Sequence, residues 1–356
     1  MSRILVLLLL LLIAMPSMAQ QPFRVMEYNV ENLFDTQDDV GTSDEDFLPD
    51  GRCQWDTLRY RKKLADLSKI IMAAGGATPV DLIALCEVEN DSVLTALTQR
   101  TRLHRLGYEY VVTKSNDVRG IDVALLYQPM RFGLLEWREM SVPYDSEKER
   151  PTRHILHATG RLQSGDTLDV FVAHFPSRRG GAKATEAYRC RAAKVLRNAA
   201  DSIVRHRATP LVVITGDFND EPQNKSIAEV IGAQSAQQFS PRKPKQSAAS
   251  VKEKMSPYMI LSDRLSACDG KVKGTYKYQG NWNRLDHIIV HSSMLSASHS
   301  LHTSPQDCQI FAHPYLLTDD PNEWQGVQPR RMFLGDFYKG GVSDHLPLVL
   351  TLWMSK

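Results

Sequence analysis

Residues 211–220 read LVVITGDFND, an apolar run that ends in a cluster of polar residues. A run of aliphatic and β-branched residues is typical of a buried strand, and functional groups commonly lie on the loops at strand ends. Asp217 and Asn219 are two positions apart, so in an extended segment both side chains face the same side. Paired carboxylate and amide groups suit the handling of a metal, a water or a phosphate. The stretch therefore predicts one strand of a sheet with a chemical site at its end.

Outward from this stretch, short apolar runs alternate with helical patterns along the chain. Besides 211–215, strand patterns cover residues 23–30, 81–86, 108–113, 121–127, 154–162, 168–173, 285–290 and 346–352. Apolar residues have helical spacing at 64–71, before Gly75 and Gly76, and at 183–205. This many strands indicate more than one sheet, in a layered α/β or α+β fold.

The overall composition is that of an average soluble globular protein. Of the 356 residues, 42% are hydrophobic and 24% are charged, which excludes disordered, collagen-like and coiled-coil chains. Lys and Arg number 43 against 41 Asp and Glu, a net charge of +2. So small a net charge creates no overall field that would coat a polyanion, and any anionic partner must be met by a local cluster of charge.

The amino terminus has the pattern of a secretory signal peptide. An uncharged apolar run, residues 4–14, follows Arg3 and precedes Pro16 and the small residues up to Ala19. The run is shorter than the ~20 apolar residues that span a bilayer, and no cysteine follows the expected cleavage point after Ala19. We therefore expect a signal peptide over 1–19, one domain over 20–356, export to the periplasm or the exterior, and no stable membrane anchor.

The five cysteines are an odd number, so an exported chain keeps at least one thiol unpaired within itself. Cys86 and Cys190 lie in apolar or helical patterns and are interpreted as small buried residues, whereas Cys268 and Cys308 are a candidate disulfide. Residues 234–257, rich in Ser, Lys, Gln and Pro, predict a mobile surface loop. Residues 298–341 have no clear periodicity, and we expect them to shape the surface near the site.

Further polar clusters occur at the ends of other strand patterns. Asn29 and Glu31 lie in YNVEN (28–32). Glu87, in LCEVEN (85–90), directly follows an apolar run. A charged residue in such a position needs a partner, and either a cation or a nearby Arg would serve Glu87. Asn29 taken alone is more typical of a turn than of a functional site.

Three histidines also lie at strand ends. His174 is followed closely by Arg178 and Arg179, whose charges favour an anion. Asp286 precedes His287, and Asp344 precedes His345. An Asp bound to an imidazole favours its cation, which equips the histidine for a phosphate oxygen or for proton transfer. Each pair alone could equally be capping or turn chemistry.

The ordered set of these segments, from YNVEN through GDFND to SDH, resembles the endonuclease/exonuclease/phosphatase superfamily of metal-dependent phosphoesterases. The resemblance covers about residues 24–352. It implies an α+β fold, a four-layer α/β/β/α sandwich of two packed, mostly antiparallel sheets. It also implies an enzyme that needs Mg²⁺, with Mn²⁺ or Ca²⁺ as a substitute or second ion.

The resemblance assigns roles to particular side chains of this chain. It implies that Glu87 is the principal metal ligand, with Glu31 and Asp344 as further candidate ligands. Asn29 would lie near the metal and the phosphate. The catalytic group would comprise His174, Asp217, Asn219, Asp286 and His345, in which Asp217 and Asn219 orient the attacking water and Asp286 orients His345.

Arginines near these segments are candidates for holding the substrate's anion. Arg119 resembles a phosphate-facing arginine of the family, although a surface arginine at a turn would look the same. Three further cations either extend the surface that binds the substrate's anion or are ordinary solvated charges. They are Arg178, Arg179 and Lys183.

The substrate is not set by these groups, because nucleases and lipid or sugar phosphoesterases share them. The expectation is an exported nuclease or phosphodiesterase, a monomer, acting on a phosphate ester such as DNA or RNA. The alternatives are a lipid or small-molecule phosphoesterase, of the sphingomyelinase or the sugar and inositol phosphatase kind, and a noncatalytic binding module. The binding module is the weaker of these, because every polar position that hydrolysis needs holds a competent residue.

Overall fold

Two seven-stranded sheets lie face to face in the computed structural model, which describes residues 21–144, 150–238, 256–320 and 326–355. The first sheet has the order β14 (Leu301–His302), β20 (Leu348–Met354), β1 (Gln21–Leu33), β2 (Leu82–Val88), β4 (Asp122–Tyr127) and β3 (Glu109–Val112), and β15 (Cys308–Ile310) also pairs with β20. The second has the order β5 (Phe132–Met140), β6 (Ile155–Leu162), β7 (Thr167–His174), β8 (Leu211–Asp217), β13 (Asp286–His291), β10 (Tyr258–Ile260) and β9 (Gln234–Ser235).

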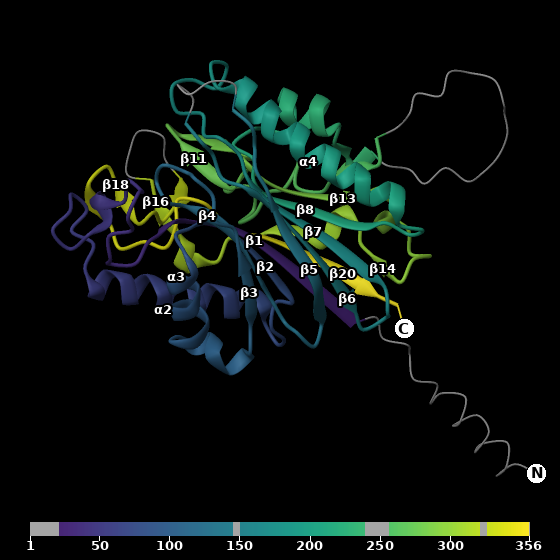
Figure 1. Ribbon diagram of the computed structural model, residues 1–356, viewed down its shortest axis with the longest axis horizontal. Coiled ribbons are helices and arrows are strands. Elements are labelled where there is room, and N and C mark those ends of the chain that lie inside the picture. Colours follow the sequence, from purple (N-terminus) through teal and green to yellow (C-terminus); the bar gives the residue numbers. More distant parts are fainter. Residues whose placement is uncertain (1–20, 145–149, 239–255, 321–325, 356) are drawn as a thin grey trace, which may run out of the picture.

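Most neighbouring strands in the two sheets are antiparallel. The parallel pairs are β1 with β2, β7 with β8, and β9 with β10. The helices lie outside the sheets, α2 (Thr57–Gly75) and α3 (Asp91–Gln99) on the side of the first and α4 (Glu186–His206) on the side of the second (Figure 1). The predicted α+β class, with two packed and mostly antiparallel sheets between helices, is confirmed.

The sequence explains why the central strands stay inside. Every residue of β4 and of β8 is buried, as the uniformly apolar runs require of strands covered on both faces. One large core fills the space between the sheets and under α2 and α3. A second core joins α4, through Ala192, Leu196 and Ala200, to the outer face of the second sheet. These two cores hold the strand ends in fixed positions.

All nine predicted strands and both predicted helices are present. The helix α2 begins after Asp56, whose side chain accepts a hydrogen bond from the Arg59 amide, and it ends at Gly76 with a φ of 65°. The structure also contains α3 and the long strand β5, which the sequence pattern did not indicate. β5 was missed because its pattern is mostly exposed beyond Phe132, as befits an edge strand.

Several short elements complete the chain. They are the 3₁₀ turns Glu45–Phe47, Arg102–Leu106, Ala236–Gln238, Ser292–Leu295, Pro305–Asp307 and Pro314–Leu316, the π-helical turn Ser226–Ile231, and the hairpins β11–β12 (Tyr276–Tyr278, Asn281–Asn283), β16–β17 (Leu317–Asp319, Val327–Pro329) and β18–β19 (Phe333–Leu334, Phe337–Tyr338). The last two hairpins lie in the stretch 298–341, for which no periodicity was visible in the sequence.

One prediction about the cysteines is wrong. All five thiols are free, and the candidate pair Cys268 and Cys308 is not bridged. Cys308 is buried on β15, whereas Cys268 is exposed and its thiol faces the Ala312 carbonyl oxygen at 3.8 Å.

Two predictions fall on residues that the structure does not describe. The signal peptide, 1–19, lies outside the described residues, and so does most of the expected loop, 239–255. Within the described ranges, no helix combines the length and the apolar character that crossing a membrane requires.

Candidate active site

Strand directions bring the polar clusters together at one end of both sheets. β7 and β8 are parallel and pair His174 with Asp217, and antiparallel β13 pairs Asp286 with Asp217. Three predicted site residues therefore lie side by side on three adjacent strands. β1 and β2 of the facing sheet, also parallel, supply Asn29 and Glu87 at the same end.

Glycine is required at the centre of this arrangement. Gly216, just before Asp217, has a φ of 139°, a conformation that other residues rarely adopt. A Cβ at this position would lie 1.9 Å from the carbonyl oxygen of Ala173 on β7. The close approach of β7 and β8, and with it the spacing of His174 and Asp217, therefore depends on the missing side chain.

Irregular backbone aims several site residues into the space between the sheets. In a regular strand successive side chains face opposite sides, yet Cys86 and Glu87 both reach β7. The thiol of Cys86 contacts the Ala173 carbonyl oxygen at 3.6 Å, and Oε1 of Glu87 lies 4.0 Å from Nε2 of His174. The pairing register shifts between Cys86 and Val88, and Glu87 has a positive φ of 66°. This bulge turns the carboxylate inward.

Positive φ values at non-glycine residues also occur in two other segments of the site. Glu31 and Asn32 have φ values of 51° and 53° beside a register shift in β1, and Asn219 has a φ of 50°. Non-glycine residues in this region carry strain of about 1–3 kcal/mol each, which clusters at functional sites. The strain is consistent with side chains placed for chemistry.

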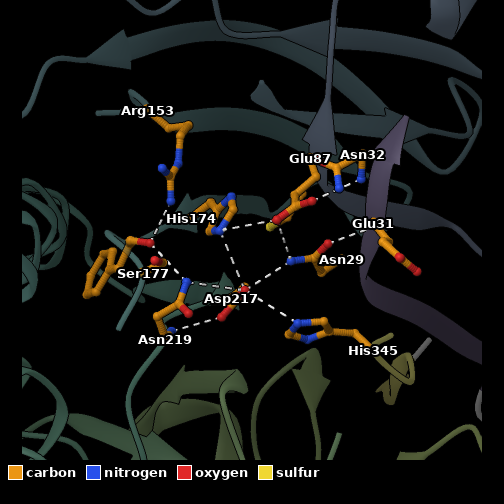
Figure 2. Close-up of polar contacts among 12 residues, drawn as sticks. Asn29, Glu31, Asn32, Glu87, Arg153, His174, Ser177, Asp217, Asn219 and His345 are labelled. Atoms are coloured by element: carbon orange, nitrogen blue, oxygen red, sulfur yellow. Dashed lines mark hydrogen bonds and ion pairs between the residues drawn. The ribbon is translucent and has the colours of Figure 1, made fainter. Parts of the chain in front are cut away.

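Asp217 is the hub of the site (Figure 2). Its Oδ1 accepts a hydrogen bond from the backbone amide of Asn219 at 2.8 Å, and its Oδ2 accepts one from Nδ2 of Asn29 at 3.0 Å. Nε2 of His174 lies 3.5 Å from the same Oδ2, and Nε2 of His345 lies 3.9 Å from it. The strand end therefore presents one carboxylate flanked by two imidazoles.

The two histidines have opposite protonation. Burial alone would lower the pKa of His345, but Asp286, whose Oδ2 is 2.8 Å from Nδ1, together with Asp217 raises that pKa well above its ordinary value. Burial lowers the pKa of His174 well below the ordinary value, and Arg153 and Arg119 lower it further. His345 is thus a cation and His174 is neutral near pH 7.

The two central carboxylates also differ. Burial, followed by the charge of Asp286, raises the pKa of Asp217 to about 7. Burial likewise pushes the pKa of Glu87 upward, but Arg119, His345 and the Asn32 amide outweigh it, so this pKa lies below its ordinary value. Pairs of groups with pKa values pushed apart are typical of acid–base sites.

The side chains present fit a divalent metal ion. Glu87 is ionised, and its side chain is 14% exposed at the cleft. Asp344 lies close to it, because the charge of Glu87 adds to burial in raising the pKa of Asp344. Oxygen donors of this kind suit Mg²⁺. Asp217, Asp286 and His345 also offer ligand atoms within 4.8 Å of one another and could bind a metal ion. The protonated state of His345 makes that second group the poorer site for a hard cation.

Glu31 occupies a different setting from Glu87. Its two carboxylate oxygens accept hydrogen bonds from the backbone amides of Met332 and Phe333, at 2.7 and 3.1 Å. Burial, then the charge of Asp344, raises the pKa of Glu31 to about 8. This carboxylate anchors the 332–333 segment beside the site.

The arginines divide into those already engaged and those facing the cleft. Arg178 donates to the Asn219 carbonyl oxygen at 2.7 Å and to Oδ1 of Asn224 at 2.9 Å, so it holds the GDFND loop. Nη2 of Arg119 lies 3.7 Å from Oε1 of Glu87, and its side chain is 45% exposed. Arg119 is therefore brought to the catalytic groups, whereas Arg178 lines the cleft wall and holds the GDFND loop in place.

Two further residues of the site were not predicted from the sequence. Arg153 is buried, donates to Asp117 and to the Phe175 carbonyl oxygen, and lies beside His174 (Figure 2). Its signal was a single arginine directly before the 154–162 strand. Tyr276 packs on His345 with ring centroids 4.8 Å apart, and no sequence pattern pointed to this contact.

The site forms the floor of an open cleft of about 1180 Å³. Its walls come from residues 117–119, 142–144, 150–153 and 176–181, and from Tyr188, Arg191, Tyr276, Tyr278, Asn283, Leu285, Arg331, Phe333 and Gly335. The prediction that the 298–341 stretch shapes the surface near the site is confirmed by Arg331, Phe333 and Gly335 in this wall.

The family model described as "Endonuclease/Exonuclease/phosphatase family" matches residues 24–354. The chain belongs to the endonuclease/exonuclease/phosphatase family. It is therefore an enzyme of the metal-dependent phosphoesterase type, and the predicted family and enzyme class are confirmed.

Solved structures of this family share the fold at low sequence identity. A family protein from Bacteroides thetaiotaomicron is 14% identical with a TM-score of 0.56, covering 94% of this chain and 96% of its own. A mannosyl-6-phosphatase of the same organism is 15% identical (TM-score 0.55, 93% and 99% covered). The human nocturnin catalytic domain with bound sulfate is 18% identical (TM-score 0.51, 94% and 95% covered). No curated protein sequence matches the chain.

Proposed function

We propose that this phosphoesterase is an exported, Mg²⁺-dependent phosphodiesterase that cleaves nucleic acid. The observation that carries the proposal is the position of Asp217, whose Oδ2 lies 3.5 Å from the neutral His174 and 3.9 Å from the cationic His345 at the floor of the cleft. Asp217, which can take a proton, thus lies beside His345, which can stabilise negative charge. Hydrolysis of a phosphate ester requires both of these functions.

Asp217 is placed to accept the proton of the attacking water. Its pKa of about 7 matches a general base that works near neutrality. Asn29 and Asn219 fix the carboxylate through hydrogen bonds to its two oxygens, at 3.0 and 2.8 Å. These bonds restrict Asp217 to one orientation and so set the direction from which the water attacks.

His345 carries the positive charge that the phosphorane-like transition state needs. Asp286 binds Nδ1, so the second ring proton, on Nε2, remains available for a non-bridging phosphoryl oxygen. Tyr276 packs against the ring and holds its plane. A metal ion held by Glu87, with Asp344 nearby, would neutralise further phosphoryl charge when bound.

The size of the cleft favours a polymeric substrate. Sites for small molecules commonly enclose ~300–1,000 Å³, and this cleft of about 1180 Å³ is open. Nucleic acid is therefore our proposal over a lipid headgroup or a sugar phosphate.

Nicking of supercoiled plasmid by the mature chain in Mg²⁺ tests the proposal. We expect nicking that EDTA abolishes and that His345→Ala reduces by at least ~10²-fold. His206→Ala, a change at an exposed histidine at the end of α4, is the matched control and should nick normally. Absence of cleavage of both the plasmid and single-stranded DNA by the unaltered protein would overturn the nuclease assignment.

Export rests on the pattern of residues 4–19 alone. Amino-terminal sequencing of the protein from a periplasmic or culture fraction should give a start near Gln20. A chain that retains Met1 in the cytoplasmic fraction would contradict export.

A further inference from the structure

Two neighbouring arginines of the cleft wall have different surroundings. Arg178 is engaged by the Asn219 carbonyl oxygen, Asn224 and Asp220. Arg179 also lines the cleft and is exposed, but its guanidinium has no hydrogen bond or ion pair with any residue that the structure describes. One charge therefore supports the loop and the next is available to a ligand.

The backbone around Arg179 is a defined turn. The Arg179 amide donates to Oγ of Ser177 at 3.1 Å, and the Gly181 amide donates to the Arg178 carbonyl oxygen at 2.8 Å. Gly180 and Gly181 have φ values of 93° and 115°, which glycine alone adopts readily. The turn presents Arg179 to the cleft on a fixed base.

An aromatic ring lies on the same wall, at the start of α4. Tyr188 lines the cleft and is 40% exposed, which is high for so large an apolar surface. The guanidinium of Arg191 lies 5.6 Å from its ring centroid and covers one face. The exposed part of the ring is available to a planar group, because an aromatic ring can stack on any base.

The wall that carries these residues differs from the floor in charge. The carboxylates in the cleft lie around the metal-binding and catalytic groups, and Asp117 is paired with Arg153 at 3.1 Å. The nearest acid along the Arg179 loop, Glu186, is bound to Lys183 at 3.1 Å. Among the described residues of this wall, Arg179 is therefore a cation that no neighbouring acid neutralises.

We propose that Arg179 and Tyr188 form an outer subsite for the part of the substrate next to the scissile phosphate, where Arg179 binds a neighbouring phosphate and Tyr188 stacks a base. The substrate is then a single-stranded polynucleotide, whose bases are free to stack. This inference rests on the proposed phosphodiesterase function and adds the substrate class to it.

Steady-state kinetics on three substrates test the subsite. Bis(p-nitrophenyl) phosphate has one phosphate and no neighbour, octathymidylate has both neighbouring phosphates and bases, and an abasic octamer has the phosphates alone. We expect Arg179→Gln to lower kcat/KM about tenfold on both octamers and less than twofold on bis(p-nitrophenyl) phosphate. Tyr188→Leu should lower it about tenfold on octathymidylate only.

Matched controls separate binding from folding and from overall charge. Lys183→Gln removes the same charge from the same segment, at a side chain that is 89% exposed and paired with Glu186, and it should change none of the three rates. The salt dependence of kcat/KM on the octamers should also flatten in Arg179→Gln, by about 0.7 in the log–log slope for one lost phosphate contact.

The outcomes are distinguishable. Failure of the unaltered protein to hydrolyse bis(p-nitrophenyl) phosphate and both octamers would overturn the proposed function. Hydrolysis with an Arg179→Gln loss equal on all three substrates, or with no loss on the octamers, would overturn the subsite while the function stands. Cleavage of duplex DNA faster than of octathymidylate would overturn the single-stranded class.

Discussion

The Nδ1 atom of His345 lies 2.8 Å from Oδ2 of Asp286, and this pair joins the loop before β20 of one sheet to β13 of the other. The bond is buried, and Asp286 is the main reason that the pKa of His345 is raised despite its burial. Removing the negative charge should therefore change the chemistry of His345 while the ring stays in place.

Asp286→Asn should lower the pKa of His345 and shift the alkaline limb of the pH–rate profile to lower pH. We also expect kcat to fall by ~10²-fold or more, because the cation that faces the phosphoryl oxygen is lost. NMR titration of the His345 ring checks the pKa. An unchanged alkaline limb in the variant would show that His345 does not carry this charge.

The pH dependence of the unaltered enzyme follows from two groups. Activity should rise as the pH increases through about 7, because Asp217 must lose its proton to act as a base, and it should fall at higher pH when His345 loses its own. A profile of kcat/KM at saturating metal from pH 5 to 10 measures both limbs. Activity that falls steadily from pH 5 to 8 would contradict the assignment of Asp217.

Glu87 and Glu31 should respond differently to replacement by glutamine. Glu87→Gln should weaken Mg²⁺ binding by at least tenfold in calorimetry, since an ionised carboxylate at the cleft is the main attraction for the cation. Glu31→Gln should instead lower the melting temperature, because its carboxylate accepts two buried amide bonds. Equal losses of metal affinity in the two variants would place Glu31 among the ligands.

Glu27 introduces a pH dependence of stability. Its side chain is fully buried on β1, and burial, then the charges of Asp286 and Asp217, raises its pKa well above the ordinary 4.5. The folded protein then binds a proton that the unfolded chain releases, so this group's contribution to stability is lost as the pH rises above 4.5.

Glu27→Gln should therefore gain stability relative to the unaltered protein as the pH increases, by up to about 1.4 kcal/mol per pH unit. Urea denaturation at pH 5, 6, 7 and 8 measures the difference. A difference that is constant across this range would show that Glu27 titrates alike in the folded and unfolded chains.

Gly216→Ala should destabilise the fold by about 3 kcal/mol or more, because a Cβ would meet the Ala173 carbonyl oxygen at 1.9 Å in a backbone with a φ of 139°. Gly165→Ala is the control, since Gly165 has a φ of 88° but no atom within 4 Å of the added Cβ. It should cost about 1 kcal/mol. Chemical denaturation measures the free energy of unfolding of both variants. Equal losses would mean that the close contact between Gly216 and β7 does not contribute to the cost of the substitution.

Much of the fold was predictable because the central strands are buried on both faces. Runs such as 211–215 and 121–127 are typical of strands that are buried inside a layered fold, and both are fully buried in the structure. The edge strand β5 and the short hairpins after residue 300 lack that signal, since they are exposed or only two or three residues long.

The candidate site was predictable as a set of residues and not as a geometry. Asn29, Glu87, Asp217 and His345 come together as expected, but nothing in the sequence indicates the bulge that turns Glu87 inward. Backbone strain of this kind is imposed by the surrounding sheet rather than by local residue preference. For the same reason, adjacent Arg178 and Arg179 look alike in sequence and differ in the structure.

The most direct test of the central claim is the rate of bis(p-nitrophenyl) phosphate hydrolysis in Mg²⁺ by the unaltered protein and by Asp217→Asn, a change of one atom at the hub of the site. We predict hydrolysis that EDTA abolishes and that Asp217→Asn lowers by at least ~10²-fold, with the melting temperature retained. An unaltered protein without activity, or an Asp217→Asn protein within tenfold of it, would contradict the assignment of this site to metal-dependent phosphodiester hydrolysis.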